Sequence, residues 1–385
     1  MSAAPPLALY VHLPWCVRKC PYCDFNSHVH KGALPEAEYV AALLADLDAD
    51  APGAGTRRVE TVFFGGGTPS LFTPESLATF LEGVRARVAL APGAEITLEA
   101  NPGTIEHGRF RGYRDAGINR VSLGAQSFGA RQLELLGRIH AAADTGRAVD
   151  ELRSADLANF NLDLMYALPE QSLDGALADV AAAVAFAPPH LSHYQLTLEP
   201  GTVFHTRPPP LPDEDLAASI QEGTHARLAA AGYRQYEVSA WARPGAECRH
   251  NLNYWRFGDY LGIGAGAHGK LTEPGTGAIV RTEKAKQPRE YLARAARGEP
   301  LGSRSPVPAA ARPFEYLLNA LRLTEGFARA DFEARTALPV EVLEPGIAAA
   351  LARGLLEATG TGWRPTPFGL RFLNDLQALF LPGRD

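Results

Sequence analysis

Three of the four cysteines in the chain fall within eight residues, as Cys16-x3-Cys20-x2-Cys23. Thiolates grouped on one short loop suit an iron–sulfur cluster. A cubane cluster has four irons, so three cysteines leave one iron without a protein ligand. That open position can chelate the amine and carboxylate of a small molecule.

A structural zinc site is the alternative, and it needs a fourth ligand. His12, His28 and His30 are near enough in sequence to provide one. Two features favour the cluster: a strand is expected just before the motif, and Pro21-Tyr22 lies within it.

The elements that must position this loop alternate between strands and helices. Strands are expected at Leu7–Leu13, Val59–Phe64, Glu95–Ala100, Arg120–Ala125, Asn161–Ala167 and His190–Leu198. Amphipathic helices are expected near 39–47, Pro74–Val88, Ile105–Ala116, Ala142–Ala155 and Leu173–Phe186. Strands joined through helices pair in parallel by right-handed crossovers. The expected fold class is therefore α/β, an open, partial (β/α)6 barrel, with a doubly wound sheet as the runner-up.

Polar and glycine residues cluster where the expected strands end. The cysteines follow the first strand, Gly65–Pro69 follows the second, and Glu99, Gln126 and Asp163 lie in or after the next three. Loops at the carboxyl ends of parallel strands converge on one site. We therefore expect a single ligand pocket there.

One glycine motif does not fit a dinucleotide site. Gly264-x-Gly266-x-x-Gly269 matches a dinucleotide fingerprint in form, but Glu273-Pro274-Gly275 interrupts the helix that should follow. We interpret the segment as close backbone packing around the pocket, with His268 at its rim.

The rest of the chain divides into two further parts. We expect a barrel at 1–235, a segment rich in glycine and aromatic residues at 236–302, and a winged-helix-like domain at 303–385. Residues 301–385 carry nine arginines, no lysine and nine acidic residues, so no net positive charge is available for nucleic acid.

Composition agrees with an ordinary soluble protein. The formal net charge of the 385 residues is −6, which provides no attraction for nucleic acid or an anionic membrane. The start, Met1–Leu9, lacks the pattern of a secretion signal, and no uninterrupted apolar stretch reaches the roughly 18 residues of a membrane span. A cytoplasmic location is expected.

The stretch Tyr10–Phe25, YVHLPWCVRKCPYCDF, resembles the start of a radical S-adenosylmethionine (radical SAM) protein. More narrowly, the chain is similar to the HemW-type haem chaperones, relatives of the oxygen-independent coproporphyrinogen III dehydrogenases. The likeness continues through Phe64–Pro69, Leu123–Phe128, Asn161–Pro169 and His250–Trp255. It implies a radical-SAM barrel with a 4Fe–4S cluster on Cys16, Cys20 and Cys23, and bound SAM.

The same resemblance implies the residues around SAM. Gly66, Gly67 and Thr68 would meet the methionine amino group, and Arg138 would meet its carboxylate. The other implied cofactor-binding residues are Tyr10, Tyr22, Glu99, Gln126, Asp163, Gln195 and His268.

Two departures from the dehydrogenases favour a carrier over an enzyme. Those enzymes have a fourth cysteine two residues after the third, where this chain has Phe25. They also have a substantial segment before the cluster, whereas 15 residues precede Cys16 here. A radical-SAM oxidoreductase acting on a tetrapyrrole remains the alternative, and a zinc-stabilised binding protein is the third class.

The stretch His250-Asn251-x-x-Tyr254-Trp255 matches the motif associated with haem in the chaperones. Imidazole is a common haem-iron ligand, and aromatic rings pack against the macrocycle. The competing interpretation is a histidine that caps a turn beside two core aromatics, and Cys248 is expected to be a buried thiol. The implied partners are haem and a haem-accepting protein, which allows transient membrane association through that acceptor.

Overall fold

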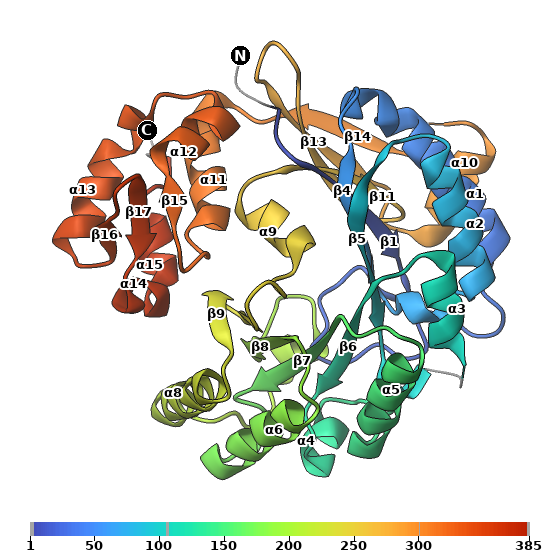
Figure 1. The fold of residues 1–385 in the computed structure, drawn as a ribbon, viewed down its shortest axis with the longest axis horizontal. Coiled ribbons are helices and arrows are strands. Elements are labelled where there is room, and N and C mark those ends of the chain that lie inside the picture. Colours follow the sequence, from blue (N-terminus) through green and yellow to red (C-terminus); the bar gives the residue numbers. More distant parts are fainter. Residues whose placement is uncertain (1–3, 105–107, 300, 383–385) are drawn as a thin grey trace.

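A curved sheet of twelve strands dominates the computed structural model, which describes residues 4–104, 108–299 and 301–382 (Figure 1). Six parallel strands form its centre: β1 (Leu7–Leu13), β4 (Val59–Gly66), β5 (Leu90–Ala100), β6 (Arg120–Gln126), β7 (Phe160–Tyr166) and β8 (His190–Gln195). They stand in the sheet in the order in which they occur along the chain. A doubly wound sheet reverses its strand order, so this order confirms the partial barrel.

The connecting helices cover the outer side of the curve (Figure 1). They are α1 (Glu36–Asp50), α2 (Pro74–Arg85), α3 (Arg109–Ala116), α4 (Ala130–Leu135), α5 (Ala142–Ser154) and α6 (Leu173–Ala185). The expected start of the third helix at 105–107 lies outside the described residues. Local chemistry sets the start of α2, because the Thr73 hydroxyl caps the Ser76 N–H at 3.3 Å and Pro74 opens the helix.

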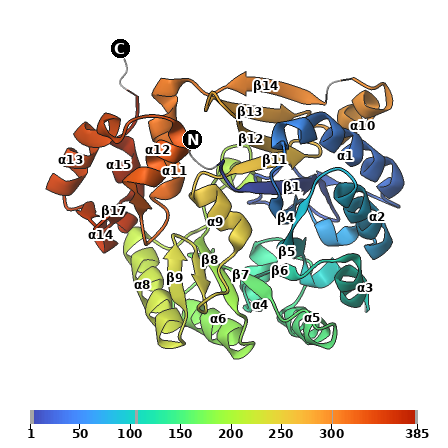
Figure 2. The ribbon, with the colours of Figure 1, turned by 45° about the horizontal axis from the view of Figure 1, so that its top comes forward.

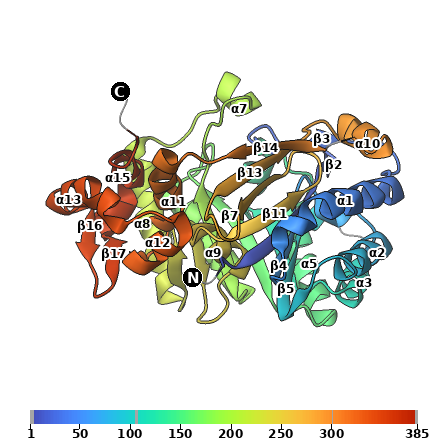
Figure 3. The same ribbon diagram turned by 90° about the horizontal axis from the view of Figure 1, so that it is seen from above.

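Later residues extend the sheet at both ends. On one side β11 (Asp259–Ile263) pairs in parallel with β1, followed by the antiparallel β12 (His268–Thr272), β13 (Ile279–Lys284) and β14 (Gly302–Pro306). Figure 3 shows β13 and β14 continuing the sheet past β11. On the other side β10 (Ala240–Ala242) pairs antiparallel with β8, and β9 (Arg234–Glu237) pairs antiparallel with β10 at the edge.

Both expected domain boundaries fall within strands of the twelve-stranded sheet. The boundary at 235 falls inside β9, and the boundary at 302 falls at the first residue of β14. Residues 236–302 contribute strands to the same sheet as the barrel. We propose that one sheet-forming unit extends to residue 306.

The C-terminal unit forms a lobe beside the sheet (Figure 2), and most members of one hydrophobic core cluster belong to it. Its helices are α11 (Arg312–Ala320), α12 (Arg329–Thr336), α13 (Glu344–Ala352), α14 (Pro367–Arg371) and α15 (Leu373–Ala378), and its strands are β15 (Phe327–Ala328), β16 (Leu356–Ala358) and β17 (Gly362–Pro365). Tyr316, Phe332 and Trp363 pack in that core. Helices followed by a small antiparallel sheet form the winged-helix-like arrangement that was expected.

The remaining elements fill the edges and the hollow side. Helix α9 (Arg249–Trp255) lies on the concave side of the sheet and faces the C-terminal unit (Figure 1). The others are α7 (Val203–Thr206), α8 (Glu214–Ala230), α10 (Pro288–Ala296) and short 3-10 turns at 51–54, 69–71, 102–104, 309–311 and 340–343. None of the helices in the described ranges is long and apolar enough to cross a bilayer.

Candidate functional site

A cavity of about 480 Å³ opens at the carboxyl ends of the parallel strands, and we call it the main cavity. Its volume is typical of small-molecule sites. The predicted residues on its wall are Cys16, Cys20, Tyr22, Cys23, Gly66, Gly67, Thr68, Glu99, Gln126, Arg138, Asp163 and Gln195. The structure thus brings these residues together from the loop after β1 and from the ends of the next five strands.

The cysteine loop is closed by a short pair of strands. β2 (Trp15–Cys16) pairs in parallel with β3 (His28–Val29). Within the loop, the Cys23 N–H donates to the Cys20 carbonyl at 3.2 Å. This pairing gathers the three thiols at one end of the cavity.

Each of the three sulfur atoms has a polar neighbour. Thr68 Oγ1 donates to Cys16 Sγ at 3.6 Å and Arg138 Nη1 donates to Cys20 Sγ at 3.7 Å, while the Ser27 hydroxyl lies 3.8 Å from Cys23 Sγ. Donors beside thiolates offset their charge and tune the reduction potential of an iron–sulfur cluster. In the described part of the chain, no three His, Cys, Asp or Glu side chains form a group that could hold a single metal ion. A cubane instead spreads its ligands over separate irons.

The glycine turn after β4 holds the cysteine loop against the sheet. Gly66 has a φ of +114°, and a Cβ there would lie 2.6 Å from the His12 ring. A Cβ on Gly67 would lie 2.5 Å from the Trp15 carbonyl oxygen. The Gly67 N–H donates to the Leu13 carbonyl at the end of β1 and the Thr68 N–H to the Trp15 carbonyl, each at 2.8 Å. The close approach expected of these glycines is therefore made to the chain itself, and these two N–H groups are already used.

The histidines near the cysteines have partners of their own. His12 Nε2–H donates to the Asn26 carbonyl at 2.9 Å, which leaves Nδ1 to accept from the Tyr10 hydroxyl at 2.9 Å. His28 Nε2 lies 3.2 Å from Asn26 Oδ1, and His30 Nε2 donates to the Ala33 carbonyl at 2.8 Å. Both ring nitrogens of His12 are therefore engaged, which disfavours it as a fourth zinc ligand, whereas His28 and His30 each have one engaged nitrogen.

Two half-buried carboxyl groups face the main cavity. Glu99 Oε2 accepts from the Gly66 N–H at 3.2 Å, and Asp163 accepts from Asn161 at 2.7 Å and from Ser122 at 3.1 Å. Burial, together with the charge of Asp163, raises the pKa of Glu99 to about 8. Burial also raises the pKa of Asp163, against the opposing hydrogen bonds. The cavity is thus prepared for a ligand with positive charge or hydroxyl groups.

Arg138 connects the cluster end of the cavity to the strand ends. Its Nη2 donates to the Gly124 carbonyl at 2.8 Å and to Asn101 Oδ1, and Asn101 Nδ2 donates to Thr68 Oγ1 at 3.1 Å. Sequence reasoning missed Asn101, although it directly follows β5 and the strand-end rule would have found it. Hydrogen bonds through Asn101 and Thr68 therefore connect the Arg138 guanidinium to Cys16 Sγ.

Gln126 has an unusual backbone and one partner that no sequence signal identified. Its φ is +67°, a region that favours glycine. Its Oε1 accepts from the buried Tyr194 hydroxyl at 2.7 Å. Tyr194 lies inside β8, where a strand-end rule has nothing to say about it.

A second cavity, of about 530 Å³, lies on the other side of the cysteine loop. Residues on its wall include Tyr10, Phe25, Tyr254, Tyr260, His268 and Lys286. It shares Asp24, Phe25, Gly66 and Glu99 with the main cavity. Two of the predicted site residues, Tyr10 and His268, therefore line the second cavity and not the main one.

The glycine segment before β12 packs against the cysteine loop, as expected. A Cβ on Gly264 would lie 2.4 Å from the His12 carbonyl oxygen, and one on Gly266 would lie 2.2 Å from Asn26 Nδ2. Asn26 Nδ2 also donates to the carbonyls of Ala265 and Lys286, both at 2.9 Å. The segment therefore fixes the loop and forms no dinucleotide site.

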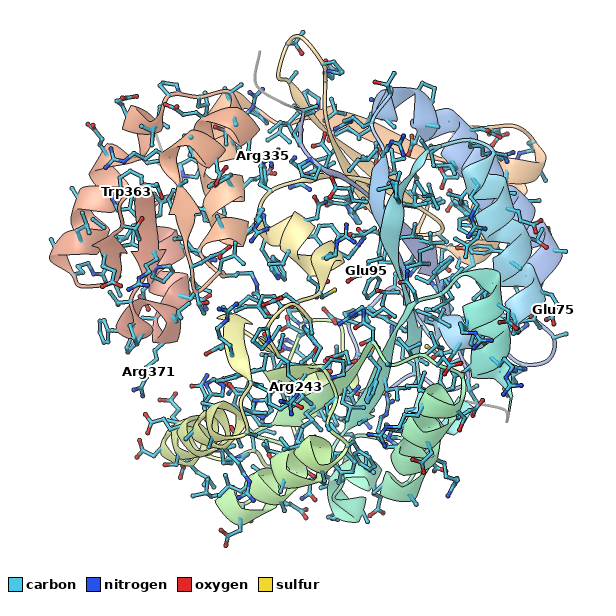
Figure 4. The ribbon with its side chains drawn as sticks, in the orientation of Figure 1. Glu75, Glu95, Arg243, Arg335, Trp363 and Arg371 are labelled. Atoms are coloured by element: carbon cyan, nitrogen blue, oxygen red, sulfur yellow. The ribbon has the colours of Figure 1, made fainter. Side chains whose placement is uncertain are left out.

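His250 is buried and lines neither cavity. Its Nδ1 lies 2.7 Å from Thr61 Oγ1 and its Nε2 lies 3.2 Å from the Tyr254 hydroxyl, so neither ring nitrogen is open to iron. The Glu95 carboxylate, labelled beside α9 in Figure 4, accepts from the His250 N–H at 3.0 Å. In this arrangement the His250 ring ties the first turn of α9 to Thr61 of β4, which differs from the turn cap considered above.

Cys248 is a buried thiol, as expected. Its Sγ donates to Glu95 Oε1 at 3.7 Å, and burial raises its pKa to about 11. Unlike His250, other members of the His250–Trp255 motif face the cavities. Asn251 and Trp255 line the main cavity, and Tyr254 lines the second.

The far end of the main cavity includes the C-terminal unit. Arg322 donates to Glu237 Oε2 at 2.9 Å and lies over the Trp255 ring, and all three residues line the cavity. Sequence reasoning missed Arg322 and Glu237, because 85 residues separate them and no local pattern joins them.

Comparison with known proteins gives two family matches and several full-length relatives. Residues 10–181 match the radical SAM superfamily and residues 307–372 match the HemN C-terminal domain. The chain is 52% identical over 381 residues to "Heme chaperone HemW" of Escherichia coli (strain K12), covering 99% of this chain and 100% of that protein. It is 49% identical over 385 residues to the protein of the same name from Haemophilus influenzae, covering 99% of each.

A solved structure agrees in fold. Coproporphyrinogen III oxidase (HemN) from Escherichia coli, described as a radical SAM enzyme, superposes with a TM-score of 0.83 at 21% identity, covering 98% of this chain and 90% of that one. At this identity the likeness concerns the fold alone. Full-length identity near one half to the relatives above is decisive for family: this chain belongs to the HemW-type haem chaperones of the radical SAM superfamily.

Proposed function

We propose that this protein binds haem and delivers it to an acceptor protein, and that it carries a SAM-ligated 4Fe–4S cluster. Membership of the radical SAM superfamily implies the cluster and SAM. The observation that carries the haem part is the 52% identity, over 99% of the chain, to a relative named as a haem chaperone.

Cys16, Cys20 and Cys23 are the proposed ligands of the cluster. Their chemistry fits the group, because three thiols line one cavity and each sulfur has a polar neighbour. When reduced, such a cluster supplies one electron to SAM at its open iron. The chain's own residues position the thiols and place a polar neighbour beside each sulfur.

SAM is proposed to occupy the main cavity beside the cysteine loop. Arg138 would pair with the methionine carboxylate, and Asp163 and Glu99 would accept from ribose hydroxyls or the amino group. The remaining proposed contacts are Tyr22, Gly66, Gly67, Thr68, Gln126 and Gln195. The fit rests on the polar groups: one half-buried guanidinium and two half-buried carboxyls face the same space.

The rival activity is oxidation of coproporphyrinogen III by radical chemistry. The likeness to the solved oxidase is one of fold and carries no activity. Phe25 stands where the dehydrogenases have a fourth cysteine, and its side chain is 58% exposed between the two cavities. At the position where the dehydrogenases have a thiol, this chain therefore has an exposed aromatic ring. This difference favours the haem carrier over the radical enzyme.

The acceptor is a further part of the proposal. A chaperone of this kind needs a protein that takes haem from it, and an acceptor located in a membrane would bring the chain to that membrane transiently.

The test uses full-length protein purified anaerobically and reconstituted with iron and sulfide. The wild type should be brown, with broad thiolate-to-iron absorption, and should bind added ferric haem and transfer it to an apo-haem protein. Cys16→Ala, Cys20→Ala and Cys23→Ala should each abolish the cluster absorption, whereas the matched control Cys248→Ala keeps it. Stoichiometric zinc without iron would overturn the cluster, and turnover of coproporphyrinogen III with SAM and a strong reductant would overturn the carrier.

A further inference from the structure

The second cavity has walls suited to a flat, aromatic, anionic ligand. Four aromatic side chains line it, namely Tyr10, Phe25, Tyr254 and Tyr260. Tyr254 and Tyr260 lie edge to face with ring centroids 4.6 Å apart, and Phe25 presents an exposed ring. Rings fixed in this way gain more from stacking on a macrocycle than flexible side chains do.

One imidazole on this wall is accessible. The His268 side chain is 57% exposed, and its Nε2 lies 4.0 Å from Glu283 Oε1 on the neighbouring strand. At 4.0 Å this contact is longer than a hydrogen bond, so the imidazole can turn a ring nitrogen towards a ligand. His268 thus differs from His250, whose nitrogens are both engaged.

The rim carries a cation that an anionic group could recruit. Lys286 Nζ lies 3.1 Å from Glu283 Oε1. The Lys286 side chain is 65% exposed and the Glu283 side chain is 46% exposed. Exposed pairs of this kind are worth only roughly 0–1 kcal/mol. The ammonium can therefore exchange Glu283 for a ligand carboxylate at little cost.

We propose that haem binds in the second cavity, with the His268 imidazole on the iron, Phe25 and Tyr254 against the macrocycle and Lys286 at a propionate. This deepens, and rests on, the proposed haem-carrier function. It removes the need to free the buried His250, and it places haem on the opposite side of the cysteine loop from the proposed SAM site. Haem and SAM then occupy separate cavities that share only the wall around Phe25, Gly66 and Glu99.

The experiment titrates ferric haem into cluster-reconstituted wild type and His268→Ala, followed by the Soret band after subtraction of the cluster spectrum. His268→Ala should shift the Soret band and weaken haem binding by roughly tenfold or more, and added imidazole should restore the wild-type spectrum. His205→Ala, an exposed histidine on neither cavity wall, is the matched control and should behave as wild type.

Two further variants separate the site from its alternatives. Phe25→Ala should weaken haem binding without shifting the Soret maximum, and Thr197→Ala, on the wall of the main cavity alone, should leave haem binding unchanged. Wild-type haem binding with unaltered spectra and affinity in both His268→Ala and Phe25→Ala would overturn this site while the carrier function stands. Failure of the wild type to bind haem would overturn the carrier function itself.

Discussion

The guanidinium of Arg322, from the C-terminal unit, lies over the Trp255 indole of α9, with 4.3 Å between its central carbon and the ring centroid. The same guanidinium pairs with Glu237, which ends β9. Next to it, the Thr324 N–H donates to the Tyr236 carbonyl at 3.1 Å. Three separate parts of the chain thus meet at the far end of the main cavity.

Loss of this contact should destabilise the protein. Arg322→Ala leaves Glu237 buried without its partner, and we expect a loss on the order of 2–4 kcal/mol, less than for a fully buried pair because some Arg322 surface reaches solvent. Chemical denaturation of the full chain measures it. Adding Glu237→Gln should recover most of the loss. Arg371→Ala removes an exposed pair with Glu222 and should cost under about 1 kcal/mol. If Arg322→Ala were as stable as wild type, the expected contribution of the Arg322–Glu237 pair to stability would be wrong.

Asp163→Asn should weaken SAM binding without loss of the cluster. It keeps the side-chain shape and removes one charge from a buried site, so roughly ten- to a hundredfold in affinity is expected, corresponding to about 1.5–3 kcal/mol. Equilibrium binding to reconstituted protein measures this, with cluster absorption as the internal reference. Arg138→Ala should lower SAM affinity as well, but it also removes a donor to Cys20 Sγ and should therefore alter the cluster spectrum. Equal SAM affinity in wild type and Asp163→Asn would exclude Asp163 from the site.

Glu99 should make the cofactor-free protein less stable as pH rises. Its pKa is about 8 in the fold, against an ordinary value of 4.5. Between these values the native state binds a proton that the unfolded state has lost, so the free energy of unfolding falls as pH increases. Melting temperatures of apo-protein between pH 5.5 and 8.5 test this. Glu99→Gln should flatten the profile, and an unchanged slope in that variant would refute the assignment.

Buried histidines should make the protein less stable as the pH falls below neutral. Burial lowers the pKa of both His193 and His250 to about 3, so they are neutral in the fold. The unfolded chain takes up protons near the ordinary value of 6.5, and stability is therefore lost as pH falls from there towards 3. Denaturation at pH 7.5 and pH 5.0 measures the loss. His193→Gln should reduce it and His205→Gln should not, whereas equal losses in all three proteins would rule out His193 as a source.

The sequence predicted the parts of the site that depend on local order. Strand ends in a parallel sheet share one edge, so Glu99, Gln126 and Asp163 could be assigned to one pocket from their positions alone. The cysteine spacing likewise identified a loop that needs no distant residue to be recognised.

What the sequence could not predict depends on pairing between distant segments. His250 looked available because Thr61 and Tyr254 were not known to engage its nitrogens. Tyr10 and His268 were expected beside SAM, but the pairing of β11 with β1 and the packing of Gly264 on His12 give them a cavity of their own. Arg322 carries no motif, and its role exists only because the C-terminal unit folds back onto β9.

The pairing of β1 with β11 has a consequence for the order of events during synthesis. β1 emerges from the ribosome early, yet its neighbour on one side is residues 259–263, and Asn26 of the cysteine loop is tied to the carbonyls of Ala265 and Lys286. Domains fold as their residues emerge, so this loop stays without its final support until about three quarters of the 385 residues have been made. Metal loading that requires a shaped loop therefore follows, and does not accompany, the translation of the first half of the chain.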